Sequence, residues 1–193
     1  MRTLVLASSS PYRRALLARL GLPFEAADPK VDERRLAGES PASLVRRLAE
    51  AKARALAGRR PQALIIGSDQ CAVTERDEIL GKPGDLERAA AQLRAASGRS
   101  VQFLTGLCVL DAATGTVQSD VVPFTVHFRK LSERQIRAYL ERERPFDCAG
   151  SFRSEGLGIA LFRRMEGTDP SALMGLPLIR LVDMLEAAGM PVL

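Results

Sequence analysis

The stretch Ser8-Ser9-Ser10-Pro11-Tyr12-Arg13-Arg14 combines hydroxyl groups, an aromatic ring and two guanidinium groups directly after a short apolar run. A helix that begins at Pro11 presents unpaired backbone N–H groups and the positive end of its dipole to this stretch. The hydroxyl of Ser8 and the side chains of Arg13 and Arg14 add donors and positive charge. The pattern therefore predicts a phosphate-type anion site, and the alternative is an ordinary capped strand-to-helix turn.

A second candidate group is the carboxyl of Asp69, which follows the apolar run 63–67. We expect that run to be a buried strand that stops at Ser68-Asp69-Gln70. Ligands gather at the carboxyl edge of the sheet in α/β folds, so an acid there is well placed for chemistry. Asp69 is predicted to hold a divalent metal or to take a proton from water. The alternative is an Asp that caps a turn.

Paired acids also occur in the stretch Val31-Asp32-Glu33, which is expected to be a loop. Together with Asp69, one of these two carboxylates would complete a site of hard oxygen ligands for Mg²⁺ or Mn²⁺. The sequence does not decide between Asp32 and Glu33. The alternative is that both are solvated loop residues.

Lysine is rare in this chain, in which arginine supplies most of the positive charge. Lys52 is expected on a helix beside small residues that permit close packing, and Lys82 in a Gly-Lys-Pro turn with little side-chain bulk. A compact ammonium group in such places can reach a polyphosphate. The alternative is that both are surface residues, so the prediction depends on the whole set of motifs.

Glycines surround Glu155 in the stretch 151–158, and they allow a ligand to approach the backbone closely. A carboxylate there matches guanine, whose N1–H and exocyclic amine lie on adjacent atoms. The alternative is a tight turn with an exposed Glu. His127 is the only histidine, which excludes any mechanism that needs two imidazoles. His127 is predicted to be structural, and a carboxylate with a metal ion is the simplest catalytic assignment.

Alternating strand and helix patterns in the first half, followed by a hairpin, predict an α/β or α+β fold around a mixed sheet. Expected strands are 3–7, 24–27, 63–67, 101–111 and 117–127, with a hairpin turn at Thr114-Gly115. Expected helices are 12–20, 40–58, 85–96, 132–143 and 176–189, with Ser40, Asp85 and Ser132 at their starts. Ile79 is expected to open a turn, and 152–161 to be loop plus strand.

The composition is that of a globular protein, with 193 residues of which 46% are hydrophobic, and predicts a single domain over 1–193. Cys71, Cys108 and Cys148 lack CxxC spacing, which argues against a disulfide framework and a zinc site and predicts buried or incidental thiols. No apolar run reaches the roughly 20 residues of a membrane helix, and the first residues resemble a strand rather than a secretion signal. We therefore expect a cytoplasmic protein without a membrane partner.

The net charge of +5 favours anionic partners, which include nucleic acid, anionic lipid and free nucleotides. The basic residues are scattered among acids and rarely adjoin aromatic residues, unlike the platforms that bind single-stranded nucleic acid. A nucleic-acid-binding module is therefore the weaker alternative. Salt-sensitive oligonucleotide binding without nucleotide hydrolysis would favour it.

Taken together, the motifs ASSSPYRRALL, VDE, the helix around Lys52, GSDQ, LGKP and GLPL resemble the Maf-like nucleoside triphosphate pyrophosphatases. The resemblance runs from Met1 to about Leu185, and the order and spacing of the motifs make it specific. It implies two lobes around a long, twisted mixed β-sheet with flanking helices, like the inosine triphosphatase fold, and a substrate cleft between the lobes. It also implies a homodimer, a divalent metal (Mg or Mn) and a nucleoside triphosphate substrate.

Maf-like proteins divide by substrate, and this sequence resembles the 7-methyl-GTP pyrophosphatase subgroup. The branch that acts on dTTP and UTP typically has GADT and an AYGIQG-like segment, where this chain has GSDQ and GSFRSEGLGI. The resemblance assigns substrate choice to Tyr12, Gln70 and Glu155. Some relatives have Trp at the position of Tyr12, and Tyr keeps an aromatic face of smaller area. Such a face can attract the cationic 7-methylguanine ring.

The resemblance implies hydrolysis between the α- and β-phosphates, which yields a nucleoside monophosphate and pyrophosphate and serves nucleotide-pool sanitation. It assigns Asp69 as proton acceptor and, with Glu33, as metal ligand. Phosphate binding is assigned to cationic and hydroxyl side chains, namely Ser8, Arg13, Arg14, Lys52 and Lys82. The alternatives are a dTTP/UTP pyrophosphatase of the same family and a non-catalytic regulator linked to cell-division arrest.

Overall fold

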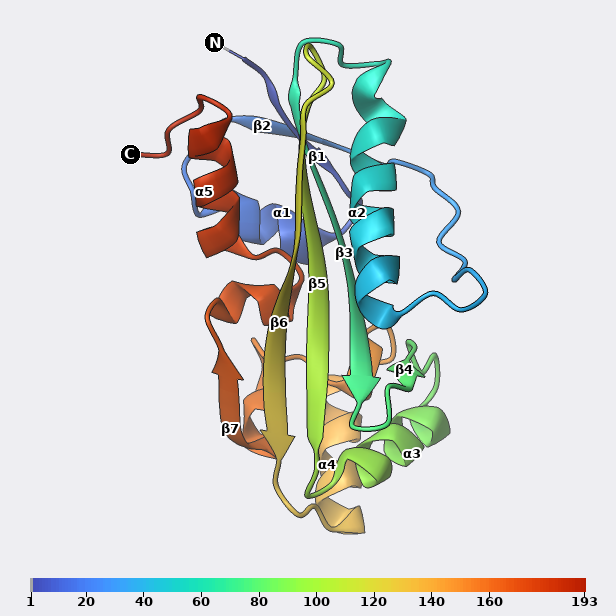
Figure 1. Ribbon diagram of the computed structural model, residues 1–193. Coiled ribbons are helices and arrows are strands. Elements are labelled where there is room, and N and C mark those ends of the chain that lie inside the picture. Colours follow the sequence, from blue (N-terminus) through green and yellow to red (C-terminus); the bar gives the residue numbers. More distant parts are fainter. Residues whose placement is uncertain (1) are drawn as a thin grey trace. The chain divides into compact units, whose positions relative to one another are not determined.

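The computed structural model describes residues 2–193 (Figure 1). Along the chain the strands and helices are β1 (Leu4–Ala7), α1 (Pro11–Ala18), β2 (Phe24–Ala27), α2 (Pro41–Ala57), β3 (Leu64–Thr74), β4 (Ile79–Leu80), α3 (Leu86–Ala96), β5 (Ser100–Asp111), β6 (Val117–Phe128), α4 (Glu133–Glu143), β7 (Phe162–Gly167) and α5 (Leu178–Ala187). Three 3₁₀ segments are η1 (Ala149–Ser151), η2 (Leu157–Leu161) and η3 (Pro170–Met174). Among the described residues, no helix is long and apolar enough to span a membrane.

The sheet is mixed and contains seven strands, in the order β2-β1-β3-β5-β6-β7, with β4 paired to β3. Strand β1 runs parallel to both β2 and β3, whereas β4 is antiparallel to β3 and β7 is antiparallel to β6. The predicted mixed α/β fold is therefore confirmed. The chain forms two compact units, and the first contains the chain up to Gln70 together with Leu104–Val122 and Asp169–Leu193.

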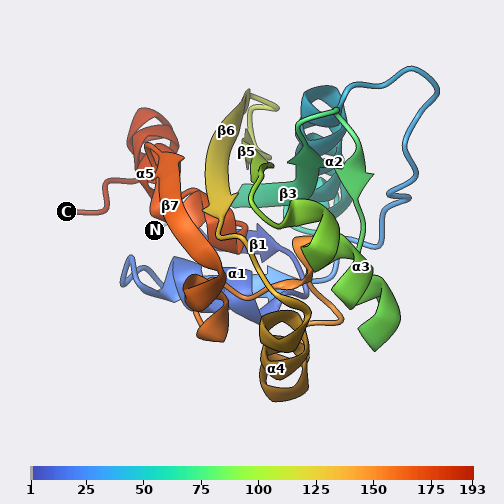
Figure 2. The ribbon, with the colours of Figure 1, turned by 90° about the horizontal axis from the view of Figure 1, so that it is seen from below.

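The first unit packs helices on both faces of its parallel strands. Leu4 and Leu6 of β1 lie in one apolar core with residues of α1 and α5, such as Leu17 and Leu181. Val5 and Ala7, which alternate with them, belong to a second core with Ala49, Ala53 and Leu56 of α2. This alternation is what a strand buried on both faces requires. Figure 2 accordingly shows α1 and α2 on opposite sides of β1.

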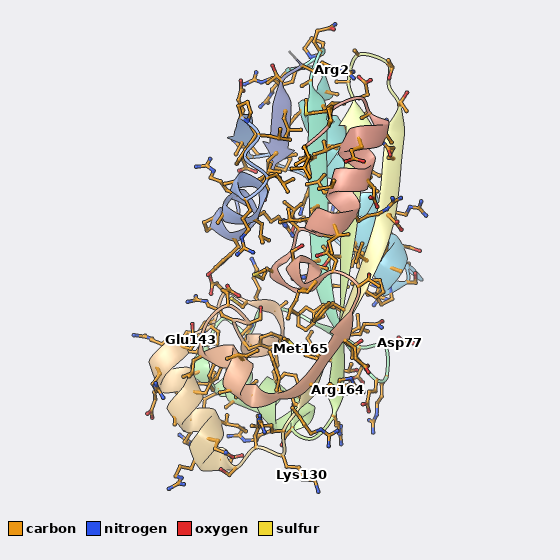
Figure 3. The ribbon with its side chains drawn as sticks, turned by 90° about the vertical axis from the view of Figure 1, so that its left-hand side faces the viewer. Arg2, Asp77, Lys130, Glu143, Arg164 and Met165 are labelled. Atoms are coloured by element: carbon orange, nitrogen blue, oxygen red, sulfur yellow. The ribbon has the colours of Figure 1, made fainter. Side chains whose placement is uncertain are left out.

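The second unit comprises Cys71–Phe103 and Pro123–Thr168. Its core contains four phenylalanines in edge-to-face contact, with ring centroids 4.7–5.7 Å apart. These rings are Phe103, Phe128, Phe152 and Phe162. Glu143 ends α4 (Figure 3), and its Oε2 accepts a hydrogen bond of 2.8 Å from the backbone N–H of Leu157. That bond fixes the start of η2 on α4.

Local sequence signals predict most of the helix starts correctly. Ser10, Ser40, Asp85 and Ser132 are N-caps whose side chains accept from backbone N–H groups of the first turn, and Ser132 forms a capping box with Gln135. The hairpin turn at Thr114-Gly115 is also confirmed, since it joins the neighbouring strands β5 and β6.

Three expectations about strands are wrong. Strand β3 does not stop at Asp69 but continues to Thr74, because β5 and then β4 supply pairing partners beyond the end of β1. The expected turn at Ile79 contains the two-residue strand β4. The stretch 152–161 contains no strand, because its glycine-rich part folds as the 3₁₀ segment η2, and the strand β7 begins only at Phe162.

The histidine lies on a strand, and the three cysteines differ in burial. His127 lies on β6, where its Nε2 is 3.0 Å from Glu166 Oε2 and 3.2 Å from Arg164 Nη2, and Figure 3 shows Arg164 on β7. The thiols of Cys71 and Cys108 are buried, and that of Cys148 is half-buried. The structural role predicted for His127 stays a prediction.

Candidate active site

The turn from β1 into α1 has the predicted capped geometry. Ser10 is the N-cap, and its Oγ accepts from the backbone N–H of Arg13 at 3.4 Å. Ser8 is buried, and its Oγ accepts from the backbone N–H of Ser10 at 3.1 Å. Pro11 occupies the first helical position, where no N–H is needed. The hydroxyl oxygens thus satisfy N–H groups of their own turn, and the predicted phosphate role of Ser8 stays a prediction.

The two adjacent arginines of α1 differ in their surroundings. Arg13 is half-buried, and its Nε donates to the carbonyl oxygen of Gly175 at 2.8 Å. Burial lowers the pKa of Arg13, and the carboxylates of Asp69 and Glu33 counter that shift electrostatically. Arg14 is exposed. Of these two arginines, the half-buried Arg13 therefore interacts electrostatically with both acids.

The ammonium group of Lys52 pairs with two of the predicted site acids, Asp69 and Glu33. Its Nζ lies 2.6 Å from Asp69 Oδ1 and 2.6 Å from Glu33 Oε1. The side chains of Lys52 and Asp69 are only 7% and 13% exposed, whereas that of Glu33 is 61% exposed. The cluster therefore opens to solvent on the side of Glu33. The carboxylate of Asp32 instead pairs with Arg34 at 2.6 Å.

Two glycines let α2 bring Lys52 this close to β3. A Cβ atom on Gly67 of β3 would lie 2.0 Å from the carbonyl oxygen of Ala49, and one on Gly106 of β5 would lie 2.1 Å from that of Val45. Such contacts are impossible, so only glycine permits this approach of helix and sheet. Lys52 extends from the buried face of the same helix.

Asp69 lies two positions beyond the last parallel pair of β3, which joins Ala7 to Gly67. It therefore sits just past the carboxyl end of β1, as ligand-binding groups do in α/β folds, although β3 itself continues. Burial raises the pKa of Asp69, and the positive charges of Lys52 and Arg13 partly offset that shift. An acid with a raised pKa beside cations is a typical general base.

The residues that flank Asp69 in β3 make neutral hydrogen bonds. Ser68 Oγ lies 2.9 Å from the carbonyl oxygens of both Gly106 and Gly175. Gln70 Nε2 donates to the carbonyl oxygens of Ala172, at 2.7 Å, and Leu173, at 3.2 Å. These bonds attach β3 to η3 and its C-cap. The carbonyl of Gly175 is thus shared by Ser68 and Arg13.

Sequence analysis did not identify Ser68, Thr105 or Gly175 as parts of this arrangement. Thr105 Oγ1 donates to the carbonyl oxygen of Ala172 at 2.9 Å and lies 3.0 Å from Gln70 Nε2. The sequence signal for two of them was that Ser68 lies in GSDQ and Gly175 in GLPL, and both motifs belong to the set that carries the resemblance. A backbone carbonyl acceptor has no residue-type signature, so its partners could not be found from the sequence.

The remaining predicted site residues are Tyr12, Lys82 and Glu155. Tyr12 is half-buried on α1. Lys82 and Glu155 belong to the second unit, where both are exposed, and Glu155 Oε2 accepts from Ser154 Oγ at 3.2 Å. Their shared role with the acids of the first unit stays a prediction.

Comparison with known proteins identifies the family. The model of the Maf-like protein family matches residues 3–188. The chain belongs to the Maf family. The predicted family membership is therefore confirmed over nearly the whole sequence.

Several relatives of this Maf protein are named 7-methyl-GTP pyrophosphatase. The one from Pseudomonas aeruginosa is 62% identical over 192 residues, covering 100% of both chains. The one from Nitrosococcus oceani is 61% identical, covering 99% of this chain and 96% of the relative. Among solved structures, the Ham1 protein of Staphylococcus aureus matches with a TM-score of 0.44 and 15% identity over 68% of this chain and 73% of that chain.

Proposed function

We propose that this Maf protein is a nucleoside triphosphate pyrophosphatase that converts 7-methyl-GTP to 7-methyl-GMP and pyrophosphate. The observation that carries the proposal is the buried Asp69–Lys52 pair, with Glu33 on the same ammonium group and Arg13 in the field of both acids. Relatives of 62% and 61% identity that carry this name support the choice of substrate.

In the proposed reaction Asp69 accepts a proton from the water that attacks the α-phosphorus. The new bond joins that water oxygen to the α-phosphorus, and the bond from the α-phosphorus to the bridging oxygen breaks. Pyrophosphate leaves with the bridging oxygen. Arg13 and Lys52 stabilise the negative charge that the leaving group gains, which is the usual protein contribution to phosphoryl transfer.

Asp69 and Glu33 are also the proposed ligands of a divalent cation. One oxygen of each carboxylate lies 2.6 Å from Lys52 Nζ, so the two acids are close enough to share a cation. Mg²⁺ is typically held by one or two carboxylates together with substrate phosphates, and this donor set fits that pattern. Within residues 2–193 no cluster of three or more acidic, histidine or cysteine side chains suits a metal. When bound, the ion supplies Lewis-acid polarisation of phosphate oxygens and water.

Substrate choice is assigned to Tyr12, Gln70 and Glu155, and phosphate binding further to Ser8, Arg14 and Lys82. The amide N–H groups of Gln70 already bond to the protein, which leaves its Oε1 as the atom for a base edge. The homodimer implied by the resemblance and the cytoplasmic location expected from the sequence also stay predictions. Sedimentation velocity tests the homodimer.

The deciding experiment is an assay of pyrophosphate release. The panel contains 7-methyl-GTP, GTP, dTTP, UTP and ATP, each with Mg²⁺, with Mn²⁺ and with a chelator. We expect the highest kcat/KM for 7-methyl-GTP and no release with the chelator. Activity on dTTP and UTP alone would contradict the substrate, and no release from any nucleotide would contradict the enzymatic function.

A further inference from the structure

Arg47 of α2 holds the segment that carries Glu33. Residues 28–39, between β2 and α2, contain no helix or strand. Arg47 donates from Nε to Glu39 Oε1 at 2.6 Å, and from Nη2 to Glu39 Oε2 at 2.8 Å and to the carbonyl oxygen of Arg34 at 3.0 Å. One guanidinium group therefore bonds both the end of the segment and the residue directly after Glu33.

Glu39 makes further hydrogen bonds within this segment. Its Oε2 accepts from the backbone N–H of Leu36 at 3.1 Å, and its carbonyl oxygen accepts from Arg35 Nε at 2.8 Å. Its side chain is only 8% exposed, although it lies in an irregular segment. Pairing with Arg47 lowers the pKa of Glu39 to about 2, so the carboxylate stays ionised. Residues 34–39 are thus fixed on α2 by a two-pronged ion pair.

We propose that the Arg47–Glu39 pair is a clamp that positions Glu33 against Lys52 and Asp69, which makes Arg47 and Glu39 positioning residues of the reaction. The inference rests on the proposed function. Glu33 is exposed, and among residues 2–193 its ion pair with α2 is the bond to Lys52. Without the clamp, residues 34–39 lose the ion pair and the hydrogen bonds that Arg47 makes with them. Glu33 then loses the fixed distance at which it shares Lys52 with Asp69.

A different role for Arg47 would be purely electrostatic, because its charge also interacts with Asp69 and Asp32. The two roles differ in the signs that they predict for variants of the two members of the pair. Arg47→Ala removes a positive charge near an anionic substrate, and Glu39→Ala removes a negative one. An electrostatic role makes these variants shift kcat/KM in opposite directions. A clamp makes both lower it.

The experiment compares Arg47→Ala and Glu39→Ala with the control Arg46→Ala. Arg46 is the adjacent arginine on α2, but it bonds to Ser119 Oγ at 2.8 Å and to the Ser119 carbonyl at 3.1 Å, away from the clamped segment. We expect both clamp variants to lower kcat/KM for 7-methyl-GTP by about tenfold or more, as for other partners that orient a ligand group. Arg46→Ala should stay within about twofold of wild type.

Two further measurements separate positioning from a general structural role. Hydrogen exchange of the Leu36 amide, in protein without metal or nucleotide, should speed up in both clamp variants and not in Arg46→Ala. In the Glu33→Gln background, Arg47→Ala should lower kcat/KM no further, because the clamp acts through Glu33. Melting temperatures identify any variant that fails to fold, and Arg47→Lys, which keeps the charge but not the two-pronged bond, then replaces Arg47→Ala.

Opposite shifts of kcat/KM, equal effects of Arg46→Ala and Arg47→Ala, or an undiminished loss in the Glu33→Gln background would each overturn the clamp. If wild-type protein releases no pyrophosphate from any nucleotide, the proposed function fails. The exchange of the Leu36 amide still tests the clamp in that case.

Discussion

The two sides of β3 around Asp69 are built from different interactions. Asp69 faces Lys52 and, through it, Glu33, so this side has charges of both signs and an exposed acid. Ser68 and Gln70 point the other way, as alternation along a strand requires, and bond only to neutral groups. On the charged side, the ionic groups can each replace one of their protein partners with a ligand. The neutral side is satisfied within the protein and holds the strand against η3.

The comparison predicts that changes on the charged side remove activity while the fold survives. Asp69→Asn should lower kcat for pyrophosphate release by about a hundredfold to ten-thousandfold, because an amide cannot take the proton. The melting temperature should change little, since the amide oxygen still accepts from Lys52 and Glu33 still pairs with it. The control is Asp77→Asn, an exposed acid outside the site (Figure 3), which should behave as wild type. Normal turnover by Asp69→Asn would contradict its role.

The next largest effect is expected where α2 meets the sheet. Gly67→Ala places a Cβ 2.0 Å from the Ala49 carbonyl oxygen, so α2 must move away from β3 and take Lys52 with it. We expect the free energy of unfolding to fall by about 1–3 kcal/mol or more, together with a loss of activity. Gly58→Ala, at the C-cap of α2 with open space around it, should be neutral. Chemical denaturation of both variants measures the difference.

On the neutral side a substitution should affect stability more than chemistry. Ser68→Ala removes the hydroxyl that lies 2.9 Å from the carbonyls of Gly106 and Gly175, and the site is fully buried. The expected loss in the free energy of unfolding is about 1–3 kcal/mol, because buried carbonyls lose a donor. We expect kcat/KM to fall by less than tenfold, since Arg13 still bonds to Gly175. A loss of activity as large as that of Asp69→Asn would contradict the prediction that the neutral side affects stability more than chemistry.

The smallest expected effect is a shift in pH dependence. Burial raises the pKa of Asp69, and the proposed base must be ionised, so kcat/KM should fall with decreasing pH at values above the ordinary pKa of an aspartate. Lys52→Gln removes the positive charge that holds this pKa down. The acidic limb of the profile, in which kcat/KM falls with decreasing pH, should therefore move to higher pH. Lys130→Gln, an exposed control in the second unit, should leave the limb in place. A limb that moves to lower pH would contradict the assignment.

Local features of the fold were predictable because their causes are local. A serine or aspartate before a helical pattern accepts from the first turn whatever lies further away, and Ser10, Ser40, Asp85 and Ser132 all do so. The length of β3 was not predictable, because its last residues pair with strands that come later in the chain.

For the candidate site, the sequence alone determined which residue types are available and in what order the motifs follow, and that order sufficed to recognise the family. Only the tertiary structure decided that Glu33 rather than Asp32 pairs with Lys52, and that Arg13 is half-buried and interacts with both acids whereas Arg14 is exposed. The physical reason is that neighbouring residues of similar type have the same local propensities. Their partners are set by how closely distant backbone segments pack, and here that distance depends on Gly67 and Gly106.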